Sequence, residues 1–151
     1  MREIVFDTET TGLNPATGDR MIEIGCIEMI NRVETGRSFH AYFNPLRPMP
    51  SEAEAVHGLS NLFLSAQPLF GDRVEELIEF LDDSPLVAHN ASFDFGFLNH
   101  ELQLCGRPLV CMNHGADFRA LERELFGGDT DAAKLLLRRI GSRLKRIGRG
   151  S

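Results

Sequence analysis

Apolar and polar residues follow β-strand patterns along the first third of the chain. Residues 2–7 form a short apolar run that ends in polar side chains, residues 21–30 are rich in β-branched residues, and residues 37–43 alternate. Runs of this kind, bounded by turn residues, predict strands. Residues 31–36 are then expected to form a hairpin loop, so the chain is predicted to open with an antiparallel three-stranded unit.

The pattern changes to helical spacing after a proline-rich link at residues 44–50. Apolar residues recur every three or four positions in residues 72–81 and again in residues 93–104, which predicts two amphipathic helices. The short apolar segment 86–89 between them is expected to be a buried strand. Alternation of strand and helix predicts an α/β protein, in which parallel strands join the antiparallel unit to form a mixed sheet flanked by helices.

Composition restricts the class of protein. The chain has 151 residues, of which 42% are hydrophobic and 25% charged, as expected for one globular domain with a substantial core. Its three cysteines, Cys26, Cys105 and Cys111, form neither an even disulfide framework nor a close-spaced zinc set. No run approaches 18 apolar residues, and no signal peptide opens the chain. We therefore expect a cytoplasmic protein without a membrane partner.

The charges are unevenly distributed. Residues 1–133 hold all 22 acidic side chains and nine of the 16 basic ones, whereas residues 134–151 are basic and carry an apolar stripe. Such an acidic body does not favour binding of nucleic acid by bulk electrostatics, so metal ions or a local patch would have to supply positive charge. The basic amphipathic helix predicted for residues 134–151 could dock on the core, contact nucleic acid or an acidic partner, or be mobile.

Two carboxylates at the end of the first strand are candidates for metal binding. Asp7 and Glu9 are two residues apart, so they project from the same face of an extended backbone. Their mutual repulsion is relieved by solvent or by a hard divalent cation such as Mg²⁺ or Mn²⁺. The alternative interpretation is a solvated strand end followed by a turn at Gly12.

A third carboxylate follows the predicted strand at residues 86–89. Asp94 lies near the start of the next helix, where Asn90 or Ser92 could be the N-cap. Asp94 could serve only to complement the helix dipole. If parallel strands bring it beside Asp7 and Glu9, the three carboxylates could instead hold two metal ions about 3.5 to 4 Å apart, as in phosphodiester cleavage.

These segments resemble a known family. Residues 7–12 (DTETTG) and 89–98 (HNASFDFGFL) are similar to the first and second motifs of the DEDD-type 3′–5′ exonucleases, and most similar to the proofreading epsilon-subunit group of bacterial DNA polymerase III. Residues 55–59 (AVHGL), followed by Pro68, also match that group. The resemblance covers residues 2–110 and implies a ribonuclease-H-like fold with metal-dependent release of nucleotides from a 3′ end.

The resemblance also implies roles for individual residues. Asp7, Glu9 and Asp94 would be the catalytic residues and the ligands of two divalent ions, Mg²⁺ or Mn²⁺. The implied substrate-binding residues around the terminal nucleotide are Thr8, Thr11, Gly12, His57, Asn90 and Phe93. His57 could instead be a loop histidine with a structural hydrogen bond, and Asn90 and Phe93 could also serve in capping and core packing.

The family's third motif, a histidine followed five residues later by an aspartate, departs from the pattern here. His114-Gly-Ala resembles its opening, but Arg119 stands where the aspartate belongs, and Asp117 comes two residues early. Either a deletion has joined the motifs, with Asp117 or Asp131 standing in, or the resemblance ends near Val110. We therefore divide the chain into an exonuclease-type domain at residues 1–110 and a divergent helical segment at residues 111–151, which is part of the same domain or a truncated remnant.

The function expected from the resemblance is a 3′–5′ DNA exonuclease of the proofreading type, with reduced activity if the third motif is damaged. Its substrate would be a single-stranded or frayed DNA 3′ end, and its partner a polymerase catalytic subunit. Two alternatives stay open. One is an exonuclease acting on RNA or short oligonucleotides, and the other is a non-catalytic module that binds nucleic acid or a polymerase.

Overall fold

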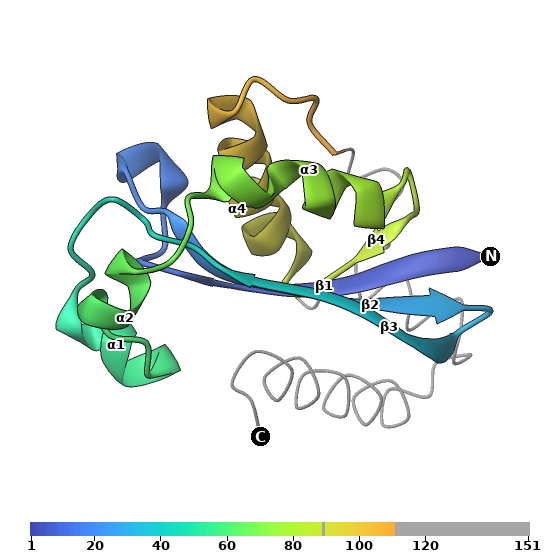
Figure 1. The fold of residues 1–151 in the computed structure, drawn as a ribbon, viewed down its shortest axis with the longest axis horizontal. Helices are drawn as coiled ribbons and strands as arrows, with labels where there is room; N and C mark the ends of the chain where they lie inside the picture. The colour runs from blue at the N-terminus through green and yellow to red at the C-terminus, as the bar shows by residue number, and fades with distance from the viewer. Residues whose placement is uncertain (89, 111–151) are drawn as a thin grey trace.

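The computed structural model describes residues 1–88 and 90–110. Within them the chain forms one four-stranded sheet, one 3-10 turn and four helices (Figure 1). In chain order these are β1 (Arg2–Thr10), η1 (Pro15–Thr17), β2 (Met21–Ile30), β3 (Val33–Tyr42), α1 (Ser51–His57), α2 (Asn61–Ser65), α3 (Phe70–Leu81), β4 (Leu86–Val87) and α4 (Ala91–Leu104).

The sheet is mixed, as the sequence predicts. Its strand order is β3-β2-β1-β4; β1 pairs antiparallel with β2, β2 pairs antiparallel with β3, and β4 pairs parallel with β1. The parallel contact is short and joins Ile4 to Leu86 and Val5 to Val87. Strand β1 therefore lies between β2 and β4, the strand that leads into α4, so the first and second sequence motifs lie close together at β1.

The predicted hairpin loop at residues 31–36 is wrong. Ile30 pairs with Val33, so the turn consists of Asn31 and Arg32 alone, both with positive φ (49° and 70°), as two-residue hairpins require. Gly36 instead lies where the register of β2 and β3 shifts, and its φ of 93° suits a bulge. Gly36, which the prediction placed in the loop, therefore lies at an irregular point inside strand β3.

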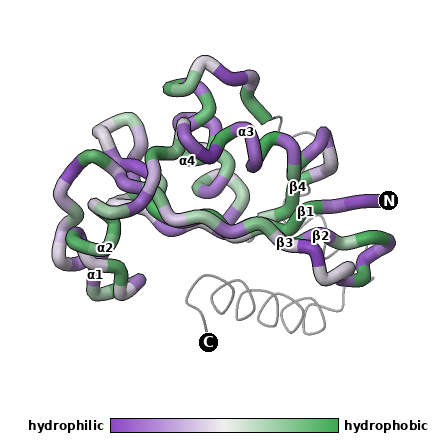
Figure 2. The backbone as a smooth tube through the Cα atoms, viewed as in Figure 1, coloured by the Kyte–Doolittle hydropathy of each residue, from purple (hydrophilic) through white to green (hydrophobic). Residues whose placement is uncertain are grey.

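Helices α3 and α4 cover one face of the sheet (Figure 1). The main core lies between them and the strands, and the apolar stripe of α3 (Val74, Leu77 and Leu81) is buried in it. Phe6 of β1 packs edge-on against Phe95 of α4, with ring centroids 5.3 Å apart. Figure 2 shows apolar residues concentrated along the central strands and polar residues alternating along the helices. The helices predicted at 72–81 and 93–104 are confirmed, each beginning two residues earlier than expected.

Helices α1 and α2 lie together at one end of the sheet (Figure 1). They enclose a second, smaller apolar cluster, whose buried members are Ile22, Met49, Leu59 and Leu64. Ile22 reaches it because the register of β1 and β2 shifts: Glu9 pairs with Glu23 but Thr10 with Met21, which leaves Ile22 as an extra residue. The bulge thus occurs at the end of β1 that carries the first motif.

None of the described helices is long and apolar enough to cross a membrane. The helix predicted at residues 134–151, and the segment 111–151 as a whole, lie outside the described residues.

Candidate active site

The carboxyl end of β1 carries the first two candidate carboxylates. Asp7 and Glu9 are both half-buried and occupy alternate positions of one strand, so they share a face, as the sequence predicts. Asp7 pairs across the sheet with Gly25, and Glu9 pairs with Glu23. Gly25 has no side chain, so no side chain of β2 lies directly opposite Asp7.

The third carboxylate belongs to the first turn of α4 and is almost fully buried. Asp94 is 3% exposed, and its Oδ1 accepts a hydrogen bond from the hydroxyl of Thr8, 2.5 Å away. The pKa of Asp94 is raised to about 7: burial is the largest cause, the hydrogen bond from Thr8 lowers the pKa, and the negative charge of Asp7 raises it. The structure therefore brings Asp94 into the electrostatic field of Asp7, through the parallel contact of β4 with β1.

The donor set suits a hard divalent cation. Among the described residues no three His, Cys, Asp or Glu side chains are arranged to hold one metal ion. However, a buried carboxylate whose pKa is raised beside a second carboxylate is stabilised by an added positive charge, and oxygen is the donor that Mg²⁺ and Mn²⁺ prefer. Asp94 and Asp7 therefore fit such an ion chemically, and the three-ligand site with Glu9 stays a prediction.

The loop after β1 is organised by an aspartate that sequence reasoning missed. Asp19 accepts hydrogen bonds from the Thr11 hydroxyl at 3.0 Å and from the Asn14 backbone N–H at 3.2 Å. A Cβ on Gly12 would lie 2.4 Å from Asp19 Oδ2, so the close approach requires glycine there. Thr11 is fully buried, and its hydroxyl also accepts a bond from the backbone N–H of Arg20.

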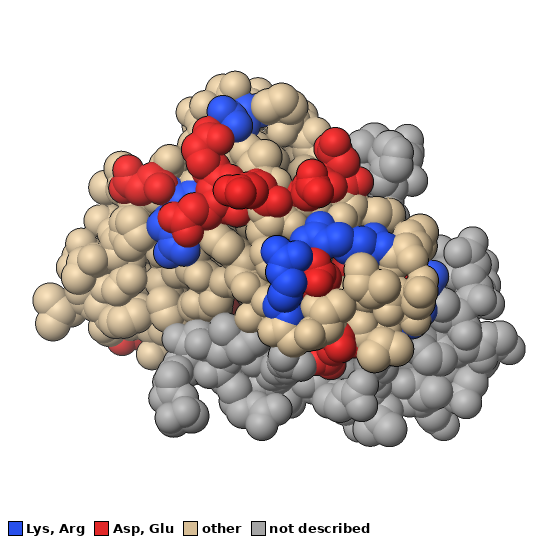
Figure 3. Space-filling model, turned by 45° about the vertical axis from the view of Figure 1, so that its right-hand side comes forward, with Lys and Arg blue, Asp and Glu red and all other residues tan. Residues whose placement is uncertain are grey.

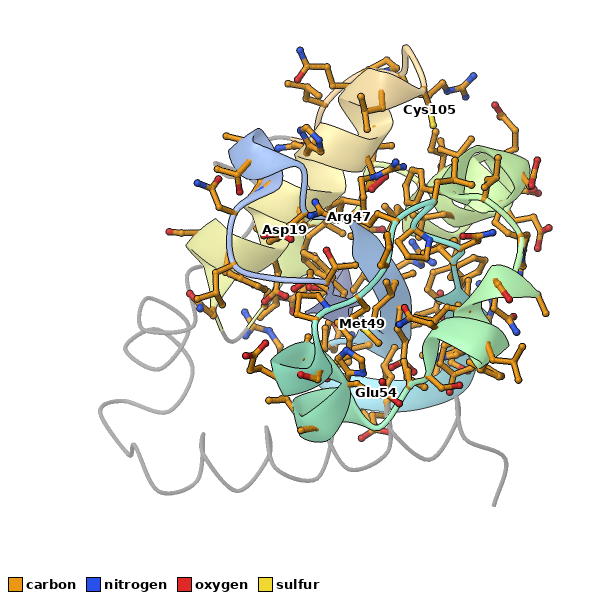
Figure 4. The ribbon with its side chains drawn as sticks, turned by 90° about the vertical axis from the view of Figure 1, so that its left-hand side faces the viewer. Asp19, Arg47, Met49, Glu54 and Cys105 are labelled. Atoms are coloured by element: carbon orange, nitrogen blue, oxygen red, sulfur yellow. The ribbon has the colours of Figure 1, made fainter. Side chains whose placement is uncertain are left out.

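Two further contacts fix this loop to the rest of the protein. Figure 4 shows Asp19 beside Arg47 of the proline-rich segment before α1, and their ion-pair distance is 3.6 Å. Arg20 binds the buried Glu101 of α4 through two nitrogens, with Nε–Oε1 at 2.6 Å and Nη2–Oε2 at 2.9 Å. The hydrogen bond to Glu101 raises the pKa of Arg20, which keeps the guanidinium charged. The first motif is thereby anchored to both neighbouring helical regions.

His57 is buried at the C-terminus of α1. Its Nδ1 accepts a hydrogen bond from the backbone N–H of Leu59 at 3.1 Å, which leaves Nε2 as the nitrogen that carries the proton in the neutral ring. A structural hydrogen bond of this kind was one of the two interpretations of His57. It is compatible with a substrate-binding role of Nε2, which stays a prediction.

The remaining candidates of the second motif lie at the start of α4. Asn90 is the exposed N-cap, and its carbonyl rather than its side chain accepts a bond, from the backbone N–H of Asp94. Phe93 is half-buried, packs against the main core and lies 5.0 Å from Phe97 between ring centroids. Core packing by Phe93 is therefore observed. The third-motif candidates, His114, Asp117, Asp131 and Arg119, lie outside the described residues.

Acidic side chains gather on another face of the molecule. Figure 3 shows them as a band across one side, and the exposed acidic residues of α3 and its C-terminal turn are Asp72, Glu75, Glu76, Glu79, Asp82 and Asp83. A surface of this sign repels a polyanion. A nucleic acid would therefore approach from a different side than this surface of α3.

Comparisons with known proteins identify the family. The family model described as Exonuclease (RNase_T) matches residues 4–143. The chain therefore belongs to this exonuclease family, and the resemblance noted in residues 7–12 and 89–98 is confirmed.

Relatives and solved structures are consistent with this assignment. A DNA polymerase III subunit epsilon from Rickettsia felis is 49% identical over 131 residues, covering 85% of this chain and 57% of that protein. The subunit epsilon from Salmonella typhimurium is 41% identical over 145 residues, covering 91% of this chain and 60% of that protein. The chain thus spans about three fifths of the length of these curated relatives.

The fold is similar to part of exonuclease I. A structure of Escherichia coli exonuclease I in complex with a dT13 oligonucleotide superposes with a TM-score of 0.70 at 15% identity, covering 83% of this chain and 29% of that chain. Another exonuclease I structure gives a TM-score of 0.71 at 16% identity, covering 81% of this chain and 29% of that chain. At this level of identity the likeness concerns the fold, and it confirms the expected ribonuclease-H-like α/β architecture.

Proposed function

We propose that this chain carries the nuclease centre of a 3′–5′ exonuclease that removes nucleotides from DNA 3′ ends, as the proofreading subunit of a replicative polymerase. The observation that carries the proposal is the buried Asp94 carboxylate, held by Thr8 and lying in the field of Asp7 at the end of β1. Family membership and the curated relatives named DNA polymerase III subunit epsilon support it. A cytoplasmic location belongs to the same proposal.

The carboxylates have a defined task in this proposal. Asp7, Glu9 and Asp94 would hold divalent cations, Mg²⁺ or Mn²⁺, and such cations supply charge stabilisation at the phosphate and a water of lowered pKa. Asp94 must lose its proton before it can act as a ligand, because its pKa lies near 7. Thr8 favours that ionised form and fixes the orientation of the carboxylate.

The neighbouring groups would receive the substrate. Thr11 and Gly12 belong to the loop that Asp19 organises, where the missing Cβ of Gly12 makes room for the Asp19 carboxylate that shapes the loop. His57 would contribute from α1, and Asn90 and Phe93 from the start of α4. A single-stranded or frayed terminus fits best, because the terminal nucleotide must leave its partner strand to reach the carboxylates.

A labelled oligonucleotide tests the proposal directly. The 151-residue protein is incubated with a single-stranded DNA labelled at its 5′ end, with Mg²⁺ or Mn²⁺, and the ladder of shortened products is followed. We expect shortening from the 3′ end that EDTA abolishes and that Asp7→Ala reduces at least a hundredfold, because the variant lacks a metal ligand. Asp72→Asn, an exposed position of α3, is the matched control and should retain activity.

Two outcomes would contradict the catalytic proposal: no shortening at high enzyme concentration, or equal shortening by Asp7→Ala. A ribo-oligonucleotide of the same sequence distinguishes DNA from RNA as the substrate. Association with a polymerase catalytic subunit is tested separately, by size-exclusion chromatography of the two proteins together and apart. Binding without metal-dependent shortening would favour a non-catalytic binding module.

A further inference from the structure

A fourth carboxylate lies directly across the sheet from Glu9. Glu23 of β2 is the register partner of Glu9 on β1 and is buried. Directly paired residues of antiparallel strands point to the same face, with Cβ atoms about 4.5 to 5.5 Å apart, and like charges at such a pair are destabilising. The fold therefore places two carboxylates side by side at the edge of the candidate metal site. The orientation of each carboxylate determines how strongly the two repel each other.

His40 of the edge strand holds the Glu23 carboxylate. The distance between His40 Nε2 and Glu23 Oε2 is 2.7 Å, and both side chains are largely shielded from solvent, at 13% and 9% exposure. In the sheet register His40 pairs with Gly25, which in turn pairs with Asp7. The contact is thus diagonal, and Oε2 of Glu23 lies toward His40 on β3.

Aromatic contacts fix the position of the His40 ring. It lies edge-on to Tyr42 with ring centroids 4.6 Å apart, and Tyr42 lies edge-on to Phe63 of α2 at 4.9 Å. Tyr42 also packs against the small apolar cluster between the sheet and α1 and α2. Rings in such T-shaped pairs have few alternative orientations in a packed environment. His40 is therefore a fixed donor whose position depends on α2.

We propose that His40 and Glu23 form a positioning pair for Glu9. By holding the Glu23 carboxylate toward β3, His40 keeps it from repelling Glu9 or competing with it for a cation, so that Glu9 stays available as a ligand. This inference rests on the proposed function, in which Glu9 binds a divalent metal. His40 touches neither metal nor substrate and acts only through Glu23.

A double-mutant cycle at pH 8 tests the pair. The variants are His40→Ala, Glu23→Gln and the double variant, all made in the 151-residue protein. We expect His40→Ala to lower kcat at least tenfold and to leave KM for DNA within threefold of the wild type. The reason is that the Glu23 carboxylate, without its contact to His40, disturbs Glu9 and not the contacts with DNA. The double variant should return to within threefold of Glu23→Gln, because the Glu23 carboxylate that His40 contacts is then absent.

Two further measurements separate positioning from packing. His40→Gln, whose amide can donate in place of Nε2, should stay within threefold of the wild type. Mn²⁺ titrations monitored by electron paramagnetic resonance should give a dissociation constant for His40→Ala that differs at least threefold from the wild type, a difference that the double variant removes. A double variant as impaired as His40→Ala in both measurements would show that packing alone matters, and would overturn the proposal.

Melting temperatures of the metal-free protein test this inference separately from the proposed function. In EDTA, His40→Ala should lower the melting temperature by at least about 3 °C, and adding Glu23→Gln should restore most of that loss, because the like-charge contact with Glu9 is gone. Additive melting-temperature changes would overturn the positioning pair. A wild type that neither binds Mn²⁺ nor shortens DNA would overturn the proposed function instead. The melting temperatures of the single and double variants would still show whether His40 and Glu23 act as a pair.

Discussion

The hydroxyl of Thr8 donates a hydrogen bond to the carboxylate of Asp94 across 86 residues of sequence. Because this bond favours the ionised carboxylate, Thr8→Val should raise the pKa of Asp94 above about 7. Carbon-detected NMR titration of the Asp94 carboxyl measures the effect. Thr35→Val removes a comparable hydroxyl bond, to Glu28, and should leave the Asp94 titration unchanged. An unchanged or lowered pKa in Thr8→Val would contradict the assignment.

The stability of the metal-free protein should fall as Asp94 ionises. Its pKa is raised from an ordinary 3.8 to about 7, so the folded state binds the proton more tightly than the unfolded state does, and stability is lost as pH rises from 4 toward 7. Between pH 5 and pH 8 the free energy of unfolding of the wild type should drop by about 2 to 3 kcal/mol more than that of Asp94→Asn. Urea denaturation in EDTA gives both values, and parallel pH profiles would show that Asp94 titrates normally.

Metal affinity should have the opposite pH dependence. About nine tenths of Asp94 is protonated at pH 6 and about one tenth at pH 8, so Mn²⁺ should bind about tenfold more weakly at pH 6. Calorimetric titrations in two buffers of different ionisation enthalpy should detect proton release on binding at pH 6. Asp94→Asn should bind more weakly, with little pH dependence between pH 6 and 8. A wild-type affinity that does not change over this range would contradict the proposed ligand role.

Gly12→Ala should damage the loop after β1. The added Cβ would lie 2.4 Å from Asp19 Oδ2, and that carboxylate is held by Thr11 and Asn14, so relief requires breaking those bonds. We expect a loss of about 1 to 3 kcal/mol in unfolding free energy and a KM for DNA raised at least tenfold. Gly96→Ala is the control: nothing lies within 4 Å of its Cβ on α4, so it should stabilise by up to about 1 kcal/mol. Equal effects of the two substitutions would contradict the steric argument.

Arg20→Ala should be among the most destabilising charge deletions in the described residues. Glu101 is 1% exposed and would be left as an uncompensated buried carboxylate, a change that costs about 3 to 5 kcal/mol in comparable cases. Adding Glu101→Gln should recover part of this loss. Arg73→Ala, which removes an exposed pair with Glu76, should cost less than about 1 kcal/mol. Chemical denaturation of the wild type and the three variants gives these losses, and similar losses for Arg20→Ala and Arg73→Ala would contradict the buried-pair argument.

The sequence predicts those parts of the fold in which periodicity reflects burial. The apolar stripe of α3 is buried as expected, and residues 21–30 form a strand with the expected bounds. Helix α1 could not be predicted in this way, because Ser51–His57 is short and its apolar Val56 is exposed. The two-residue turn at Asn31 and Arg32 was missed because an arginine gives no signal of a left-handed backbone.

The candidate site was predictable only as far as its residues stand in local motifs. Asp7, Glu9 and Asp94 are visible because two short segments carry them, and the parallel pairing of β4 with β1 follows from strand and helix alternation. Glu23 and His40 meet only because of the register of β2 and β3, and the bulge at Ile22 sets the register of Glu23 against β1. Asp19 acts through the loop that follows β1. A signal exists for Asp19, which follows the Thr11-Gly12 turn closely, but its contact with Thr11 requires the loop geometry.

The two-residue strand β4 also has a consequence for how the protein folds. Strands β1 to β3 are neighbours in sequence and can pair by local hairpin closure, whereas β4 joins β1 only after a chain of about eighty residues has closed. The meeting of Asp7 with Asp94 therefore depends on the most non-local pairing of the sheet. During synthesis, residues 7–12 emerge and can pair well before residues 89–98 exist, so the nascent chain would complete the candidate site only when α4 has docked.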